Sequence, residues 1–226
     1  YMNTGSTFQS TFQSDFSVSC WFKQNSVSSH MALFGSRKTS DPRNAVLAYI
    51  TNTNAIVFWV EVNGTPKIQS SFTHTSDYNW HHFCGTVKQT GDKVEVRCYI
   101  DGEYKSLASN TVTLSSYENS APLAIGARNY ASSDPDTYFD GKLNEVAIFD
   151  SALSDGDLSQ YQSASGEIAA LYNNGIPGDL TSFEPVSWWK MGDTEGGAGT
   201  TIADEIGENN GTLIGEINFT TDVPTI

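Results

Sequence analysis

The chain has 226 residues, 38% of them hydrophobic and 12% aromatic, which is enough for one large β-type core and excludes an intrinsically disordered protein. Its formal net charge of -14, from 26 acidic and 12 basic residues, opposes the attraction that drives binding to nucleic acids and anionic membranes. No apolar run approaches the roughly 18 residues of a membrane span. The chain opens at Tyr1 without a signal-peptide pattern, so we expect a processed or excised piece that neither binds nucleic acid nor inserts into membranes.

Alternating apolar and polar residues predict a series of β-strands along the first two thirds of the chain. In chain order, the predicted strands are residues 16–22, 45–50, 55–62, 80–87, 94–100, 111–114, 123–125 and 142–149. Turn-forming pairs such as Asn63-Gly64, Asp101-Gly102 and Asp140-Gly141 separate neighbouring strands. Since short turns join antiparallel neighbours, the pattern indicates antiparallel sheets.

A helix is predicted for residues 166–174. Ser163 or Ser165 can cap its start, and Gly175 followed by Pro177 can end it, with Glu167 in the first turn. Its apolar residues recur at helical spacing and are expected to pack on the outside of a sheet; they are Ile168, Leu171 and Tyr172.

The cysteines Cys20, Cys84 and Cys98 are odd in number, so at least one thiol stays outside any internal disulfide. Cys20 and Cys98 occupy apolar positions of predicted strands. We therefore expect buried, unreactive thiols rather than a bridge from Cys20 to Cys84 or Cys98. The absence of a Cys-x-x-Cys pair argues against zinc binding and redox chemistry.

The chain changes character after residue 180. A strand-like stretch at 186–191 precedes an acidic, glycine-rich loop at 192–199 and further segments with few apolar residues. Trp188 and Trp189 point to opposite sides if this stretch is extended. Since roughly forty residues of this kind cannot form a core alone, we assign residues 1–180 to one domain and expect 181–226 to dock on it.

Several stretches, in fixed order, resemble the laminin-G-like, concanavalin A-like jelly roll of the pentraxin/laminin-G superfamily. They are Asp15–Lys23, Trp80–Phe83, Tyr99–Gly102, Leu123–Gly126, Phe139–Phe149, Ala152–Ser154 and Glu167–Gly175. The resemblance implies an all-β fold, an antiparallel two-sheet jelly-roll sandwich with one short peripheral helix.

The C-terminal segment carries two further resemblances. In that superfamily a stretch similar to residues 186–213 precedes the first core strand, whereas here it follows the domain. The resemblance implies that the segment supplies edge strands in a circularly permuted arrangement, or does so for a neighbouring copy. The segment is also similar to structural and surface proteins of marine tailed viruses, which implies a virion or an extracellular fibre.

Catalytic patterns are weak in this sequence. Glucanases of the same fold use a Glu-x-Asp-x-Glu strand, which is absent, and the nearest carboxylate pairs, Glu61 with Glu95 and Asp101 with Glu103, are interpreted as solvated edge charges. His81 and His82 follow each other on a predicted strand and point to opposite faces, so they cannot chelate one ion together and are interpreted as structural. We therefore expect no enzyme.

Calcium is the metal that the sequence best accommodates. Modules similar to this one often hold calcium at a loop rim through Asp, Asn and backbone oxygens. Asp134 and Asp136 flank Pro135 in a polar loop, and Asp41 and Asn44 lie in an earlier loop that could meet it. These four residues are the predicted calcium ligands, although each is also an ordinary turn former. Asn144 stands where the family usually has Asp, which argues against an ion there.

Glycan binding would use aromatic rings, because a ring face stacks on the apolar face of a sugar. Tyr78, Tyr130 and Tyr138 are the candidate ligand-binding residues, and Trp59 is expected to be buried.

The sequence thus predicts a non-catalytic recognition or decoration module, extracellular or on a virion surface, that binds a glycan or a protein. It is expected to contact neighbouring structural subunits or to form a homo-oligomer. Two alternatives stay open, namely a purely structural assembly subunit without a ligand and a glycoside hydrolase.

Overall fold

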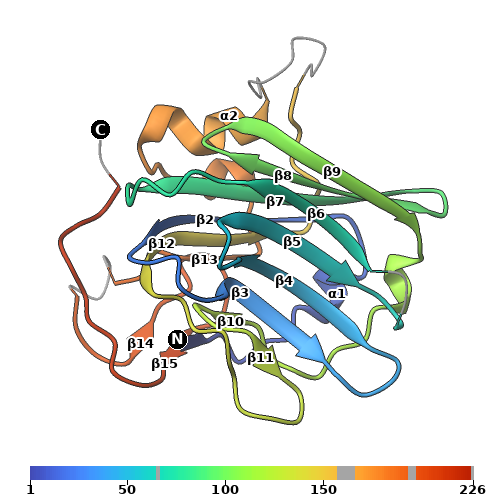
Figure 1. The fold of residues 1–226 in the computed structure, drawn as a ribbon, viewed down its shortest axis with the longest axis horizontal. Helices are drawn as coiled ribbons and strands as arrows, with labels where there is room; N and C mark the ends of the chain where they lie inside the picture. The colour runs from blue at the N-terminus through green and yellow to red at the C-terminus, as the bar shows by residue number, and fades with distance from the viewer. Residues whose placement is uncertain (65–66, 157–165, 193–196, 225–226) are drawn as a thin grey trace.

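The computed structural model describes residues 1–64, 67–156, 166–192 and 197–224 and shows two β-sheets packed face to face (Figure 1). The six-stranded sheet has the order β13-β12-β2-β7-β8-β9. The nine-stranded sheet has the order β14-β15-β1-β10-β3-β4-β5-β6, with β11 pairing in parallel beside β3. The other pairings are antiparallel, which confirms the predicted all-β, two-sheet jelly-roll sandwich.

The first nine strands of the chain form most of both sheets, with β3 to β6 consecutive in the nine-stranded sheet and β7 to β9 consecutive in the six-stranded sheet. Up to residue 111 they are β1 (Met2–Asn3), β2 (Phe16–Gln24), β3 (Met31–Lys38), β4 (Asn44–Ile50), β5 (Ala55–Glu61), β6 (Ile68–Thr73), β7 (His81–Thr90), β8 (Lys93–Ile100) and β9 (Glu103–Thr111). The later strands are β10 (Ala124–Ile125), β11 (Asn129–Tyr130), β12 (Gly141–Phe149), β13 (Ser187–Trp189), β14 (Thr201–Ile202) and β15 (Gly211–Leu213).

Three long strands were not predicted from the sequence, and one predicted strand is wrong. β3 was not predicted, because its first six residues are buried and so lack an alternating pattern. β6 and β9 were not predicted either, since serine, threonine and charged residues fill much of their length. The strand predicted at 111–114 is wrong, because β9 ends at Thr111 and a 3₁₀ turn follows at Leu114–Ser116.

Aromatic rings fill the space between the sheets. Phe34 and Phe58 of the nine-stranded sheet meet Phe83 of the six-stranded sheet, with ring centroids 6.0 to 6.3 Å apart. At one end of the sandwich, the short helix α1 (Gln9–Phe12) places Phe12 4.8 Å from Phe16. Rings of this size fill much of the space between the two sheets together with the aliphatic side chains of the same cluster.

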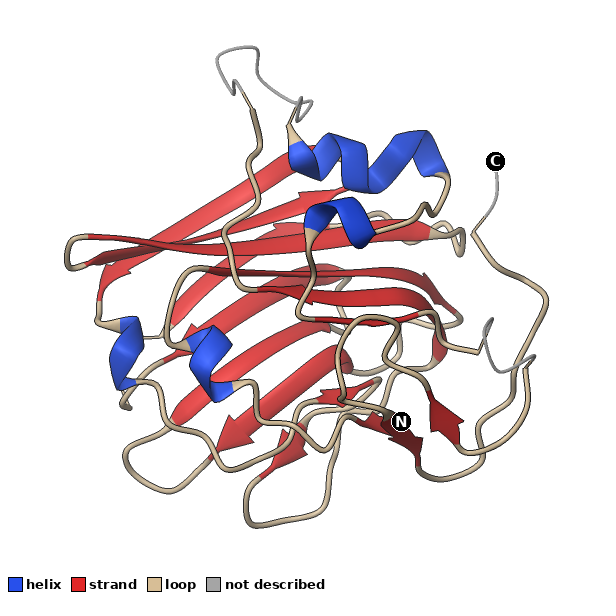
Figure 2. Cartoon of the chain, turned by 180° about the vertical axis from the view of Figure 1, so that it is seen from behind, coloured by secondary structure: helices blue, strands red, loops and turns tan. Residues whose placement is uncertain are grey.

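Helix α2 (Glu167–Tyr172) lies over the six-stranded sheet, on the side away from the nine-stranded sheet (Figure 1 and Figure 2). As predicted, Ile168 and Leu171 are buried against that sheet. The helix is shorter than predicted, since a 3₁₀ turn begins at Asn173, and the expected caps Ser163 and Ser165 lie outside the described residues. Another residue, Ser154, holds the helix start: its backbone N–H donates to the Glu167 carboxylate at 2.7 Å.

The C-terminal segment adds strands to both sheets. β13 pairs with β12, and β15 pairs with β1, in the register Met2 to Leu213. Trp189 is buried between the sheets, while Trp188 packs on the opposite face with α2, which confirms that the two rings point to opposite sides. The domain boundary at residue 180 stays a prediction.

The cysteines are free and buried, so the disulfide alternatives are wrong. Cys20 and Cys98 lie between the sheets, and Cys84 lies on the opposite face under α2. Among the described residues, no helix is long and apolar enough to cross a bilayer.

Candidate functional site

The outer face of the nine-stranded sheet carries a second apolar surface. Pairing of β3, β4 and β5 aligns Gly35, Leu47 and Trp59 in one row and Arg37, Ala45 and Glu61 in the next. The strip also contains Val57 and Ala32, and its apolar members are buried although the inter-sheet core lies on the other side. We call this surface the Trp59 face and define it as Ala32, Arg37, Ala45, Leu47, Val57, Trp59 and Glu61.

Two cations lie over the indole of this face. The Arg37 guanidinium carbon is 4.9 Å from the Trp59 ring centroid, and the Lys67 ammonium is 4.4 Å from it. Such cation–π contacts are worth about 0.5–2 kcal/mol each. In the part of the chain that the structure describes, neither cation forms an ion pair with a carboxylate. Their charges are therefore available to an anion.

Buried polar atoms without hydrogen bonds gather on the same face. Glu61 is 0% exposed, and its two carboxylate oxygens accept no hydrogen bond from the described part of the chain. Arg43 lies 3.7 Å from that carboxylate, within ion-pair range but too far for a hydrogen bond. The Nε atoms of Arg37 and Arg43 and the indole N–H of Trp59 also make no hydrogen bond to any residue that the structure describes. Each unsatisfied buried group costs about 1–3 kcal/mol, so a hydroxyl-rich ligand can recover energy here.

The burial of Glu61 corrects the sequence interpretation. This residue is not a solvated edge charge, because it lies in the second apolar surface. Glu95 is on the other sheet, paired with Lys93 and Arg97. The two carboxylates therefore cannot flank one glycosidic bond. Period-2 alternation puts residues 59 and 61 on the same side of a strand, a signal that the sequence interpretation did not use, but alternation does not tell an inner face from an outer one.

The predicted calcium ligands do not converge on one point. Asp136 accepts two hydrogen bonds from Arg128, each 2.8 Å, and one from the Tyr130 hydroxyl at 3.0 Å. Burial raises the pKa of Asp136, but these bonds outweigh it and hold the pKa below its ordinary value. Asp134 and Asp41 are exposed, the latter with 91% of its side chain accessible.

Asn44 is buried and its amide is occupied. Its Nδ2 donates to the Pro42 carbonyl at 3.1 Å, and its Oδ1 accepts from the Asn63 N–H at 2.9 Å. Across the four described ranges, no group of three or more His, Cys, Asp or Glu side chains is placed to hold a metal ion. Calcium binding stays a prediction.

The three candidate tyrosines lie apart from the Trp59 face or at its margin. Tyr78 and Tyr138 are 50% and 54% exposed, in the loops before β7 and β12. The Tyr138 hydroxyl donates to the Pro135 carbonyl at 2.7 Å. Tyr130 belongs to β11 beside β3, and Arg128 lies 5.2 Å from its ring centroid. Their role in ligand binding stays a prediction.

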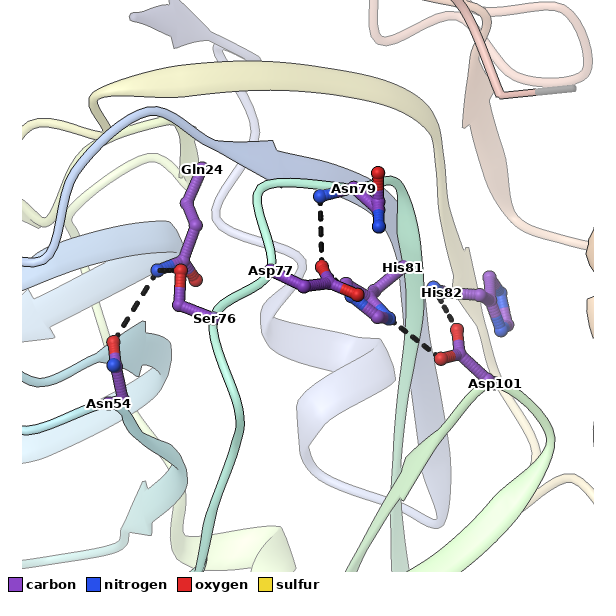
Figure 3. A network of polar contacts seen from close by, with 8 residues as sticks. All are labelled: Gln24, Asn54, Ser76, Asp77, Asn79, His81, His82 and Asp101. Carbon is purple, nitrogen blue, oxygen red and sulfur yellow. Dashed lines mark hydrogen bonds and ion pairs between the residues drawn. The ribbon is translucent and has the colours of Figure 1, made fainter.

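A polar network surrounds the two adjacent histidines (Figure 3). The His81 ring lies between two carboxylates, 2.7 Å from Asp101 and 2.9 Å from Asp77. The His82 ring points to the opposite face, where it meets Trp21 at 5.2 Å and Tyr172 at 6.2 Å. The two rings thus face opposite ways as predicted, and the His81 network ties the loop before β7 to the turn after β8.

Burial and hydrogen bonding move the pKa values of these histidines in opposite directions. Burial lowers the pKa of His81, but hydrogen bonds to Asp101 and Asp77 outweigh it and raise the pKa above 6.5. Burial lowers the pKa of His82 to about 4. The neighbouring His74 also has its pKa lowered to about 4, first by burial and then by His81. His74 and His82 are therefore neutral at physiological pH.

The architecture is that of a jelly-roll β-sandwich with a polar and aromatic outer face. A laminin-G family model described as the concanavalin A-like lectin/glucanases superfamily matches residues 1–159. The chain belongs to this superfamily, which confirms the resemblance seen in its sequence. No curated protein sequence matches the chain.

Solved structures share the fold. A leech intramolecular trans-sialidase aligns with a TM-score of 0.57 and 14% identity, over 71% of this chain and 25% of that one. The CBM40 of a Ruminococcus gnavus IT-sialidase, bound to α2,6 sialyllactose, has a TM-score of 0.52 and 11% identity, over 65% and 82%. A binding domain of botulinum neurotoxin DC, in complex with SialylT, has a TM-score of 0.51 and 17% identity, over 74% and 37%. The chain therefore spans only a part of the leech enzyme and of the toxin domain.

Proposed function

We propose that the protein is a non-catalytic module that binds acidic glycans on its Trp59 face. The observation that carries this proposal is the placement of two unpaired cations, Arg37 and Lys67, over one indole ring. The chain has only 12 basic residues against 26 acidic ones, so unpaired cations over one ring on such a chain point to an anionic ligand.

The chemistry of the face suits a sugar acid. A carboxylate or sulfate can pair with Arg37 in a bidentate geometry. Sugar hydroxyls can donate to the buried Glu61 carboxylate and accept from the Arg43 Nε–H, atoms that make no hydrogen bond to the described residues. Trp59 is only 6% exposed, but Lys67, which covers it, is an exposed side chain and can swing outward to admit a pyranose ring.

The comparisons support the choice of a first probe. The CBM40 of similar fold is described as bound to sialyllactose, a glycan that carries one carboxylate. At 11% identity this is a likeness of fold, so the ligand has to be tested on this chain.

The test compares sialyllactose with neutral lactose by calorimetry and saturation-transfer NMR. We expect the sialylated sugar to bind and lactose to bind much more weakly. The double variant R37M/K67M removes two charge-assisted contacts and should weaken binding by at least about tenfold. K88M is the matched control, because Lys88 is an exposed cation on the other sheet.

Equal binding of the two sugars would contradict an acidic ligand, and equal binding by R37M/K67M and K88M would contradict the Trp59 face. If the chain binds neither sugar, a purely structural subunit without a ligand becomes the favoured interpretation.

Display on a virion or an extracellular fibre, and association with neighbouring subunits, are part of the same proposal. A surface that carries many copies of the module compensates for the weak binding of each single site.

A further inference from the structure

A cavity of about 660 Å³ lies at the end of the sandwich, between the two sheets and under the C-terminal residues. Ile125 and Leu213 line it from the nine-stranded sheet, and Leu143 and Met191 line it from the side of β12 and β13. Its size falls within the range of about 300–1,000 Å³ that is typical of small-molecule sites. It is distinct from the Trp59 face, because no residue of that face lines it.

Residues 214–223, which we call the strap, run along this end of the molecule (red in Figure 1). The strap is held at its start by two backbone hydrogen bonds between Ile214 and Tyr1. Phe219 packs against Gly192, where an added Cβ would come within 2.4 Å of the ring. Residues 215–218 between these anchors are exposed. The strap is therefore a cover with few attachments.

The third anchor of the strap is the carboxylate of Asp222, which lies in a cluster of donors. Asp222 accepts hydrogen bonds from the Lys23 ammonium at 2.9 Å, from the Trp80 indole at 3.1 Å and from the Lys142 ammonium. β2 and β12 pair Lys23 with Lys142, so the sheet itself places two cations at the mouth of the cavity. Three donors from three strands or loops thus meet one carboxylate. This is the geometry of a built anion site, which the chain fills with its own side chain.

We propose that the cavity is a second binding site, that it takes a small molecule with an apolar body and one carboxylate, and that Asp222 holds the carboxylate position until such a ligand displaces it. The apolar body lies among Ile125, Leu143 and Met191, and the ligand carboxylate takes the contacts to Lys23, Lys142 and Trp80. Displacement of Asp222 frees the strap to move aside. This site does not depend on glycan binding at the Trp59 face.

The experiment uses decanoate and the uncharged decanol as matched probes, titrated by calorimetry into the full chain. Decanoate should bind the native protein at one site. D222N keeps the shape of the side chain and removes the competing charge, so its affinity for decanoate should rise by at least about tenfold. K23M/K142M, introduced into D222N, should abolish that gain and leave decanol binding unchanged.

The proposal is overturned if folded D222N binds decanoate no more tightly than the native chain, or if decanol and decanoate bind it equally. A residue that only tethers the strap would lower the thermal midpoint in D222N without changing decanoate affinity. If D222N does not fold, NMR of the native chain decides: millimolar decanoate should shift the methyl signals of Ile125, Leu143 and Met191, and their invariance would exclude the site.

Discussion

Burial controls the chemistry of the thiols at the scale of single residues. Burial raises the pKa of Cys98 to about 11 and raises those of Cys20 and Cys84 further. The nucleophilic thiolate is therefore almost absent at neutral pH, and no reagent can reach the sulfur atoms. The odd cysteine count showed only that at least one thiol stays outside any internal disulfide, and the apolar strand positions predicted buried thiols; the structure confirms that all three are free and buried.

We expect none of the thiols to react with Ellman's reagent in the native protein at neutral pH. After denaturation, without any reductant, all three should react. A single fast-reacting thiol in the native state would contradict the burial of that cysteine. Fewer than three thiols in the denatured chain would indicate a disulfide.

The buried histidines should make stability fall in mildly acidic solution. His74 and His82 have folded-state pKa values of about 4, against 6.5 when exposed. Between these values the unfolded chain binds protons that the folded chain excludes, so stability falls as the pH drops from about 6.5 towards 4. Each histidine contributes about 1–3 kcal/mol to this loss. His81 acts in the opposite sense, because its pKa is raised in the folded state. Its protonated form stabilises the fold at pH values below 6.5, and this contribution is lost as the pH rises through the raised, folded-state pKa.

Thermal unfolding between pH 7.5 and 4.5 measures this balance. Acidification destabilises the fold through His74 and His82 and stabilises it through His81, so the thermal midpoint should decrease overall. H82Q should show a smaller decrease than the native chain. H30Q is the control, since His30 is exposed. A native midpoint that does not change over this interval would contradict the neutral state of the buried pair.

At the scale of elements, close packing between sheets restricts the glycines of the central strands. In β7, a Cβ on Gly85 would lie 2.6 Å from the Phe58 ring of the other sheet. We expect G85A to lower the free energy of unfolding by about 1–3 kcal/mol, because Phe58 cannot move without disturbing its aromatic neighbours. G178A is the control, since its Cβ would have no atom nearer than 3.6 Å. Urea unfolding curves compare the two, and equal midpoints would contradict the tight contact.

Strands with a clear run of alternating or β-branched apolar residues could be predicted from the sequence, whereas β3, β6 and β9, which lack such a run, could not. β2, β7 and β8 were found by alternation, although each is longer than predicted. β5 was also found, but both of its alternating sets are apolar, Ile56 and Phe58 on one side and Val57 and Trp59 on the other. Apolar residues at both alternating sets of one strand indicate that both of its faces are buried, and this was the signal in the sequence for the Trp59 face. Arg37 could not be placed on it, because its strand β3 was not predicted.

At the scale of the whole molecule, the pairing of β15 with β1 brings residues 214 and 1 side by side, so the strands could be connected in a different order along the chain. Tyr1 and Ile214 face each other across this pair, with the Tyr1 ammonium 3.2 Å from the Ile214 carbonyl. A two-residue Asn-Gly link between them would form an antiparallel hairpin. We expect a permuted chain, residues 181–214, Asn-Gly, then 1–180, to fold with the circular dichroism of the native protein.

The control for this permuted chain is the native order ended at residue 214, which lacks the strap equally. Similar thermal midpoints for the two would support a permuted domain. If the permuted chain fails to fold while the control folds, the C-terminal strands require their present connection.

The late position of β13 and β15 also has a consequence during protein synthesis. β12 lacks its outer neighbour until Trp189 has been added, and β1 lacks one of its two neighbours until Leu213 has been added. Contacts between residues more than 200 positions apart form slowly. On the ribosome, a nascent chain therefore carries exposed strand edges until Trp189 and Leu213 have left the exit tunnel, and exposed edges of this kind favour aggregation during that interval.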